Sequence, residues 1–323
     1  MFQTIIGIDV SKHTLDVVML RPKGQWHKVI DNSPQGHQWL QNWIIRTKQG
    51  TIHACLEATG QYGEPVAEYL YAQGHQISVV NPARIKRYGE SKLHRNKTDK
   101  ADAALIAEFC SKEKPALWMP SPPAQKHLRC LVRYLADLES MCRQEQNRLA
   151  SGLQDEFVIH ELETHIAYMQ QRRTVIREAI QQQVETHTDL KKQQDLLVSI
   201  PGIGKFTAAR LLAELGDISA FENAPQLAAF AGLNPKGKRS GTSVYRKTHV
   251  SKEGRPFLRS ILYMPGIVAR RHNPIVHTFC DRLAAHNLPK KAVISAAMRK
   301  LLHIVYGVLK RNQPFDPNYL STA

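Results

Sequence analysis

The sequence has little cysteine and no long apolar run, and these absences exclude several classes of protein. Its 323 residues include five cysteines, and no two of them have the C-x-x-C spacing of zinc sites. A disulfide framework is therefore not expected, and reduced thiols are the default. No stretch approaches the roughly 18–20 uncharged apolar residues of a membrane span. The first residues, MFQTIIGIDV, already contain an acid, which does not suit a secretory signal peptide.

Acidic residues are scarce in the last quarter of the chain. The whole sequence has 44 Lys and Arg against 28 Asp and Glu, a formal charge of +16. Residues 233–323 hold 17 of the basic residues and three acids, so they carry +14, whereas residues 1–232 carry +2. The apolar fraction of 42% argues against intrinsic disorder. A folded chain with this surplus is expected to bind a polyanion, most simply nucleic acid, through its C-terminal quarter.

The first 110 residues alternate between strand and helix patterns. Apolar runs and turn residues predict an antiparallel meander of three strands, followed by alternating helices and strands. The predicted strands are 4–10, 14–20, 26–30, 51–56 and 76–80, and the predicted helices are 36–48, 65–72 and 101–110. Together they predict an α/β sheet of mixed strand direction.

Proline is absent from residues 125–197, which contain a single glycine, Gly152. Apolar residues recur there at steps of three and four, which predicts a long helical hairpin or coiled coil, a spacer or dimerisation arm. Four prolines within 115–123 predict an extended connector before it. A second, mostly helical unit is expected after it. Its predicted helices are 206–215, 226–231, 255–271, 274–285 and 291–310, with a Gly-, Ser- and Lys-rich loop over 234–252.

Four carboxylates occur where a sheet-based active site is expected. Asp9 ends the first predicted strand and Glu57 follows a buried-looking one, while Asp99 and Asp102 share one face of a helix. Carboxylate oxygens are ligands of hard divalent cations, and two such ions can clamp the oxygens of an in-line phosphoryl transfer. Taken alone, Asp99 can equally be the first-turn acid of a helix that Thr98 caps.

A basic stretch, residues 84–100, adjoins the two helical acids. Basic side chains beside clustered carboxylates are what a metal-dependent enzyme acting on a phosphodiester needs. A solvated charged loop has the same composition, so the pattern alone leaves both interpretations open. The residues expected to contact nucleic acid here are Arg84, Lys86, Arg87, Arg95 and Lys97.

Two further motifs lie in the C-terminal part. The segment SIPGIG at 199–204 resembles the glycine-rich turn of a helix-hairpin-helix element, whose backbone N–H groups bind phosphate, or it is a packing corner between helices. Segment 236–252 mixes basic and hydroxyl side chains, which suits a phosphate-gripping loop or an activated nucleophilic hydroxyl. The expected nucleic-acid contacts in and near these motifs are Lys205, Lys236, Lys238, Arg239, Arg246, Lys247, Lys252 and Arg259.

The order of motifs along nearly the whole chain resembles the DEDD transposases of insertion-sequence family 110, relatives of the Piv-type DNA invertases. The motifs are GIDVSK, LEATGQY, NPARIKR, RNKTDKADA, SIPGIGKFTAA, FAGLNP, SGTSV and GRPFLRSILYMP. The resemblance implies a RuvC-like (RNase H-like) catalytic domain at 1–114. It further implies a connector and coiled-coil arm at 115–195 and a mostly helical transposase domain with a helix-hairpin-helix-like motif at 196–323.

The resemblance also implies the roles of individual residues and partners. The four acids named above would hold Mg²⁺ or Mn²⁺, and Ser240, which precedes Gly241, would be the nucleophile that forms a phosphoserine intermediate. Ser243 is the nearest competing hydroxyl. The implied partners are double-stranded DNA at the element ends and target, a non-coding guide RNA, and further copies of the chain in a dimer or tetramer. The implied location is the bacterial cytoplasm at the nucleoid, without a membrane.

Three other functions stay open from the residues alone. A junction-resolving nuclease that hydrolyses DNA with metal-bound water would need the four acids but not Ser240. A kinase-like ATPase shares the hairpin pattern GIDVSKHTLDV, but the basic C-terminal quarter and the lack of a glycine-rich adenosine loop argue against it. A non-catalytic nucleic-acid-binding protein would leave the acids unexplained.

Overall fold

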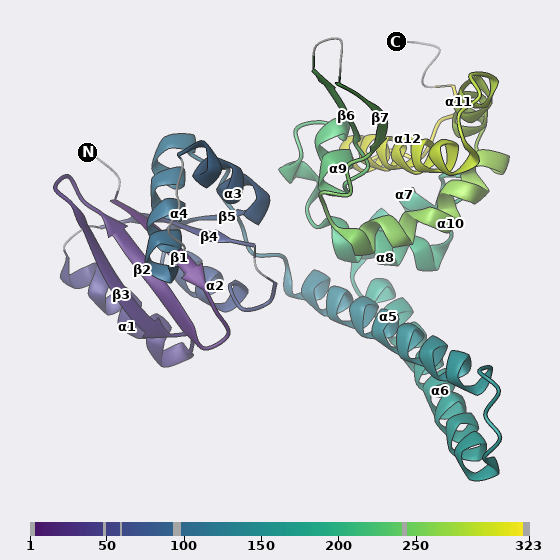
Figure 1. Cartoon of the computed structure of the whole chain (residues 1–323), viewed down its shortest axis with the longest axis horizontal. Helices are drawn as coiled ribbons and strands as arrows, with labels where there is room; N and C mark the ends of the chain where they lie inside the picture. The colour runs from purple at the N-terminus through teal and green to yellow at the C-terminus, as the bar shows by residue number, and fades with distance from the viewer. Residues whose placement is uncertain (1–3, 48–49, 59, 93–97, 241–243, 319–323) are drawn as a thin grey trace. The chain divides into compact units, whose positions relative to one another are not determined.

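The computed structural model describes residues 4–47, 50–58, 60–92, 98–240 and 244–318, with the backbone alone described at 238–240 and 244–248. The chain divides into two compact units, Met1–Pro120 and Ser121–Ala323 (Figure 1). The three-part division expected from the sequence stays a prediction.

The first unit is built on a five-stranded sheet with the strand order β3-β2-β1-β4-β5 (Figure 1). Its strands are β1 (Thr4–Val10), β2 (Thr14–Leu20), β3 (Gln25–Asp31), β4 (Ile52–Glu57) and β5 (Gln76–Val80). The first three form an antiparallel meander, and β4 and β5 extend the sheet in parallel from β1. The predicted mixed sheet is confirmed.

Helices cover both faces of this sheet. Helices α1 (Pro34–Arg46) and α2 (Glu64–Ala72) pack on one face, where Leu40 and Leu70 join the buried strand residues. The other face is covered by α3 (Pro82–Ser91) and α4 (Asp99–Glu113).

Helix α3 was not expected from the sequence. Its buried residues are Ile85 and Gly89, so the apolar spacing that marks a helix is nearly absent. The helix begins because Asn81 caps it, with the Ala83 N–H donating to Asn81 Oδ1 at 2.8 Å, and Pro82 favours the first turn.

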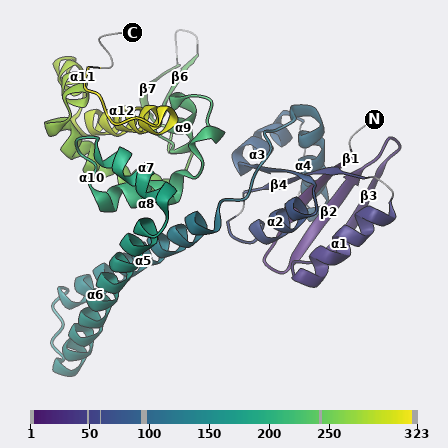
Figure 2. The ribbon, with the colours of Figure 1, turned by 180° about the vertical axis from the view of Figure 1, so that it is seen from behind.

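The second unit consists mostly of helices (Figures 1 and 2). They are α5 (Pro123–Leu149), α6 (Glu156–Glu185), α7 (Thr188–Val198), α8 (Lys205–Leu215), α9 (Ala224–Phe230), α10 (Pro256–His272), α11 (Pro274–Ala285) and α12 (Lys290–Arg311). A short 3₁₀ turn, Ile218–Ala220, precedes α9.

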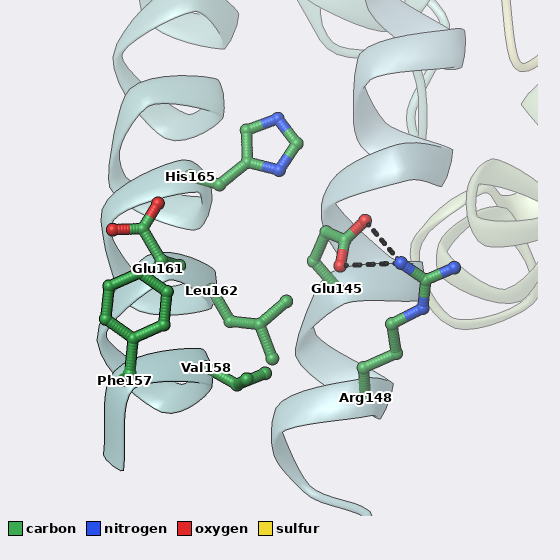
Figure 3. A pocket seen from close by; sticks show the side chains of 7 residues that line it. All are labelled: Glu145, Arg148, Phe157, Val158, Glu161, Leu162 and His165. Atoms are coloured by element: carbon green, nitrogen blue, oxygen red, sulfur yellow. Dashed lines mark hydrogen bonds and ion pairs between the residues drawn. The ribbon is translucent and has the colours of Figure 1, made fainter. Parts of the chain in front are cut away.

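Helices α5 and α6 lie side by side and form the predicted long helical hairpin (Figures 1 and 2). Buried residues from both helices, such as Leu128 and Ile180, join the core of the second unit. Toward the tip, Leu162 and Val158 of α6 face Glu145 and Arg148 of α5 across a pocket between the helices (Figure 3). A coiled-coil geometry for this hairpin stays a prediction.

The expected loop over 234–252 is wrong. Strands β6 (Pro235–Ser240) and β7 (Val244–Val250) pair in antiparallel fashion, with a register shift between Lys236 and Lys238. The Gly-, Ser- and Lys-rich composition suggested a loop, but β7 reads VYRKTHV, and its β-branched and aromatic residues favour a strand.

Among the described residues, α12 is the one helix that is long and apolar enough to cross a membrane. Its window is 39% buried inside the unit, and Leu301, Leu302 and Val305 are fully buried in the core. Its two ends carry Lys290, Lys291, Lys310 and Arg311. We therefore interpret α12 as a core helix.

Candidate active site

Asp9 and Asp102 come together because β1 and α4 pack with almost no space between their backbones. Gly7 lies two residues before Asp9 on the same face of β1 and directly faces α4. A Cβ atom at Gly7 would overlap with the backbone of Ala103 and Ala107, so only glycine fits there. The close approach carries the first turn of α4 to the end of β1.

The first turn of α4 is held by Thr98. The Thr98 side chain accepts a hydrogen bond from the Ala101 N–H at 3.2 Å, and its carbonyl accepts one from the Asp102 N–H at 2.8 Å. Asp99 and Asp102 are therefore both first-turn acids of a capped helix. Asp99 can be both a first-turn acid of a capped helix and a member of the acid set, because the cap also fixes where these carboxylates lie.

The pKa of the Asp9 carboxyl is raised by its surroundings. Burial raises the pKa of the Asp9 carboxyl, and the negative charges of Asp102 and Asp99 raise it further. A hydrogen bond from the Val10 backbone opposes this rise in pKa. Three acids of the predicted set thus interact at one edge of the sheet, and their mutual repulsion would be relieved by a cation.

Glu57 ends β4, the parallel neighbour of β1. Ile8 is in register with Leu56, so Asp9 and Glu57 follow at adjacent positions of the same sheet edge. Cys55 lies two residues earlier on the same face of β4, and the negative charge of Glu57 contributes to the raised pKa of its thiol. The sheet therefore brings Glu57 to the edge where Asp9 lies.

The donor set fits a hard divalent ion by chemistry and by charge. Carboxylate oxygens are the ligands that Mg²⁺ and Mn²⁺ prefer, and the raised pKa of Asp9 reflects first its burial and then the negative charge of the neighbouring acids. Within the part of the chain that the structure describes, no three His, Cys, Asp or Glu side chains gather as ready metal ligands. The four acids accordingly form an open set and not a preformed cage.

Sequence reasoning missed a fifth acid at this edge, Asp16 in β2. Asp16 is directly opposite Asp9 in the antiparallel register, so both side chains project from the same face of the sheet. The Asp16 carboxylate lies 2.7 Å from Nε2 of His27 on β3, and its charge contributes to the raised pKa of Asp9. Asp16 could have been noticed in the sequence, because it is an acid among the apolar residues of the predicted strand TLDVVML.

The basic residues expected near the acids lie on and after α3. Arg84, Lys86 and Arg87 are exposed on that helix, and the Arg84 guanidinium lies 5.3 Å from the centre of the Phe109 ring. Arg95 and Lys97 lie outside the described residues. Helix α3 thus supplies an exposed basic face in the unit that holds the acids.

Some of the basic residues predicted to bind nucleic acid in the C-terminal part are exposed, and others already pair with groups of the protein. Lys205 is exposed at the start of α8, and Lys252 is exposed after β7. The Lys236 ammonium pairs with the Glu253 carboxylate, and Arg259 Nη1 donates to the Ala231 carbonyl at 2.9 Å. These last two cations already have partners within the protein.

Ser240 is the last residue of β6, and its backbone is in register with Val244. The basic residues Lys238, Arg239, Arg246 and Lys247 lie along the same two strands, where the backbone alone is described. Gly241 and Ser243 lie outside the described residues. The structure therefore positions the backbone of Ser240 at the end of a basic hairpin.

The hairpin is anchored at its base by a buried ion pair. Glu214 of α8 is nearly fully buried and binds the Nε atom of Arg133 at 2.8 Å. Arg255 Nη1 lies 3.5 Å from the other carboxylate oxygen, and its backbone N–H donates to the Phe230 carbonyl at 3.0 Å. The segment that follows β7 is thus fixed to the helical core.

The SIPGIG segment forms the turn between α7 and α8. Ile200 and Ile203 are buried, and Gly202, at φ +105°, leaves a Cβ position 3.0 Å from Ala269 of α10. This is the packing corner that was one of the two interpretations. Gly204 and Lys205 are exposed at the start of α8, and a phosphate-binding role for them stays a prediction.

Two family models match the chain. A transposase model of DEDD type for insertion sequence IS110 matches residues 6–158, and a model described as transposase IS116/IS110/IS902 family matches residues 194–281. The two matched regions include the four acids and Ser240.

Relatives among known proteins match over most of the chain. The pilin gene-inverting protein of Moraxella bovis is 34% identical over 319 residues, 98% of each chain. The transposase for insertion sequence element IS1111A of Coxiella burnetii is 23% identical over 83% of this chain and 78% of its own. Among solved structures, T. thermophilus RuvC in complex with a Holliday junction substrate matches 36% of this chain and 99% of its own, at 14% identity and a TM-score of 0.28.

Proposed function

The chain belongs to the IS110 family of transposases, DNA recombination enzymes of insertion sequences, and from that premise we propose that it joins DNA strands through a covalent bond to Ser240. The observation that carries the proposal is the interaction of Asp9 with Asp102 and Asp99, at the edge where Glu57 also ends its strand. Such an acid set in the same unit as the basic face of α3 suits a phosphodiester substrate.

The acids have the task of holding a divalent ion against the scissile phosphate. When bound by Asp9, Glu57, Asp99 and Asp102, such an ion would supply positive charge that neutralises the phosphate oxygens. Asp16 lies opposite Asp9 on the neighbouring strand, where its carboxylate is 2.7 Å from Nε2 of His27. The contact between Gly7 and α4 supports this role, because it brings the helix that carries Asp99 and Asp102 against the strand that carries Asp9.

The serine step exchanges one phosphodiester for another. The Ser240 Oγ–P bond forms as the P–O bond to one deoxyribose breaks, and the hydroxyl proton ends on the leaving sugar oxygen. The reverse exchange with a new DNA hydroxyl rejoins the strands without ATP, because the phosphodiester energy is conserved. Lys238, Arg239, Arg246 and Lys247 support this assignment because they lie on the same two strands as Ser240, and basic residues hold DNA phosphates.

We assign a RuvC-like fold to the first unit, with double-stranded DNA at element ends and targets as substrate. A non-coding guide RNA selects the sites, two or four copies of the chain assemble on them, and the complex works in the bacterial cytoplasm at the nucleoid. The identity to the Moraxella bovis protein supports inversion of a DNA segment as the second candidate activity.

A covalent-adduct assay tests the serine step. Fluorescently labelled DNA carrying the element ends is incubated with protein, guide RNA and Mg²⁺, and adducts are separated by denaturing electrophoresis. The parent protein should give a labelled protein band, Ser240→Ala should give none, and the neighbouring Ser243→Ala should keep it. DNA cleavage by Ser240→Ala without any adduct would favour the water-dependent junction nuclease instead.

A further inference from the structure

Three of the four tryptophans of the chain gather at one edge of the first unit. Trp26 lies on β3, and Trp39 and Trp43 lie on α1. The ring centres of Trp26 and Trp43 are 6.4 Å apart, and those of Trp39 and Trp43 are 6.2 Å apart with their planes at 23°. The three indoles form a continuous row, here called the tryptophan platform.

The outer members of this row are exposed although they are large and apolar. Trp26 is 38% exposed and Trp39 is 43% exposed, while Trp43 packs partly against the core between α1 and the sheet. The core therefore holds Trp43 in place but does not account for the other two side chains. Exposed aromatic surface of this kind marks binding sites.

Positive charge surrounds the platform. The Arg21 guanidinium lies 3.7 Å from the centre of a Trp26 ring, a cation–π contact. Lys23, in the turn before β3, and Lys28, on β3, are both exposed. Lys28 is two residues after Trp26, so both lie on the face of the sheet that α1 covers. Residues 21–46 contain four Lys and Arg and a single acid, Asp31, at the far end of the strand.

We propose that the tryptophan platform binds the unpaired bases of single-stranded DNA. Indole faces stack on bases of any sequence, and neighbouring cations pair with the backbone phosphates. This inference rests on the proposed function, because a recombinase that cuts strands creates unpaired DNA. The platform is separate from the acids: Trp26 faces α1, whereas Asp9 and Asp102 lie on the α4 side of the same sheet.

The charge of this edge favours a nucleic acid over a second copy of the chain. Two copies meeting through this face would bring Arg21, Lys23 and Lys28 of one against the same cations of the other. Like charges at an interface disfavour association, whereas a polyanion would be attracted. Single-stranded DNA therefore suits the platform best, because its bases can stack on the indoles and its phosphates can pair with the cations.

Intrinsic fluorescence offers a direct test, because the platform holds most of the tryptophan. In the full-length Trp118→Phe protein, every remaining tryptophan belongs to the platform. Titration with a 20-nucleotide oligo-dT should quench its fluorescence. Trp39→Ala should weaken oligo-dT binding roughly tenfold, the effect of losing one stacked base, and leave duplex DNA binding within about twofold.

Matched variants separate stacking from a general effect on the fold. Ile45→Ala, which also truncates an exposed apolar side chain of α1, should leave oligo-dT binding unchanged. Trp39→Phe should recover part of the affinity, since phenylalanine also stacks. Arg21→Gln should lower the slope of log affinity against log salt by about 0.7, the value for one phosphate of a single strand.

Several results would overturn the inference. They are the absence of quenching, equal losses in Trp39→Ala and Ile45→Ala, or a dissociation of oligomers in Trp39→Ala without any change in oligo-dT binding. Binding of oligo-U at least tenfold tighter than oligo-dT would reassign the platform to RNA. Ser240→Ala should bind oligo-dT like the parent, so failure of the serine step and failure of the platform give different results.

Discussion

Gly7 and Ala103 lie in backbone contact where β1 meets α4, and no Cβ atom fits between them. This single contact determines how close the acids of the strand and of the helix can come. It also explains why a glycine stands within an otherwise β-branched and apolar strand, where glycine weakens the local structure.

Replacing this glycine should therefore damage both stability and catalysis. Gly7→Ala should lower the free energy of unfolding by about 1–3 kcal/mol, the usual effect of overpacking a tight contact. Urea unfolding and the adduct assay would measure the two effects. Gly307→Ala in α12, where a Cβ meets no closer atom than Arg311 at 3.9 Å, is the control and should not destabilise the chain. Equal behaviour of the two variants would contradict the role given to the contact.

Removing one charge from the acid set should stabilise the protein without metal. Because burial and three neighbouring acids raise the pKa of Asp9, its ionised form is less favourable in the folded chain than in the unfolded chain. In EDTA, Asp9→Asn should raise the melting temperature by about 2 °C, the shift that ~0.5–1 kcal/mol gives a chain of this length. It should also lose the stabilisation that Mg²⁺ confers on the parent. Glu113→Gln, at the other end of α4, should behave like the parent in both buffers.

The buried ion pairs of Glu214 should stabilise the folded chain more than a surface ion pair does. Glu214→Gln leaves Arg133 and Arg255 without their charged partner, and we expect a loss of about 2–3 kcal/mol, reduced from the fully buried case because both arginines are partly exposed. The matched variant is Glu139→Gln, which removes a more exposed pair with Arg177 and should cost under about 1 kcal/mol. Urea unfolding compares them, and a larger loss for Glu139→Gln would refute this assignment.

Acid should destabilise the first unit through His75. Burial lowers the pKa of His75, whose Nδ1 accepts a hydrogen bond from the Ile52 N–H while Nε2 donates to Gln41 Oε1 at 2.8 Å, as the neutral ring requires. The unfolded chain thus takes up the proton first, near its ordinary pKa of about 6.5. The stability that the neutral ring provides is complete above this pH and declines as the pH falls below it.

Urea unfolding between pH 7.5 and 5.5 would check this dependence. His75→Gln should show a weaker loss of stability over that interval, because it carries no group that the unfolded chain protonates preferentially. His286→Gln, which removes an exposed histidine, should keep the pH dependence of the parent. A His75→Gln protein as pH-sensitive as the parent would argue against the assignment.

The strands of the first unit could be predicted because their apolar residues alternate or run together. The predicted bounds of β1, β2 and β5 agree with the structure. Helix α3 could not be predicted by periodicity, since it buries little more than Ile85. The β6–β7 hairpin was missed because local composition outweighed the β-branched residues of β7 in the interpretation.

The acids illustrate where sequence reasoning ends. The sequence showed Asp9 and Glu57 at strand ends and Asp99 and Asp102 on one helix face, but the approach of α4 to β1 depends on a contact between Gly7 and Ala103 that no local pattern encodes. Asp16 was missed for a related reason: its position opposite Asp9 follows from strand register, a long-range property. The tryptophan platform likewise joins residues of β3 and α1 that only the packed unit brings together.

The most direct test of the central claim is to map the bond between protein and DNA. Adducts trapped with Mg²⁺, guide RNA and a labelled element end would be digested with nuclease and protease, and the phosphorylated peptide sequenced by mass spectrometry. The account predicts a phosphate ester on Ser240, absent when Asp9→Asn protein is used. A phosphate on Ser243 or on any other residue, or recombined DNA formed without any protein-linked phosphate, would contradict it.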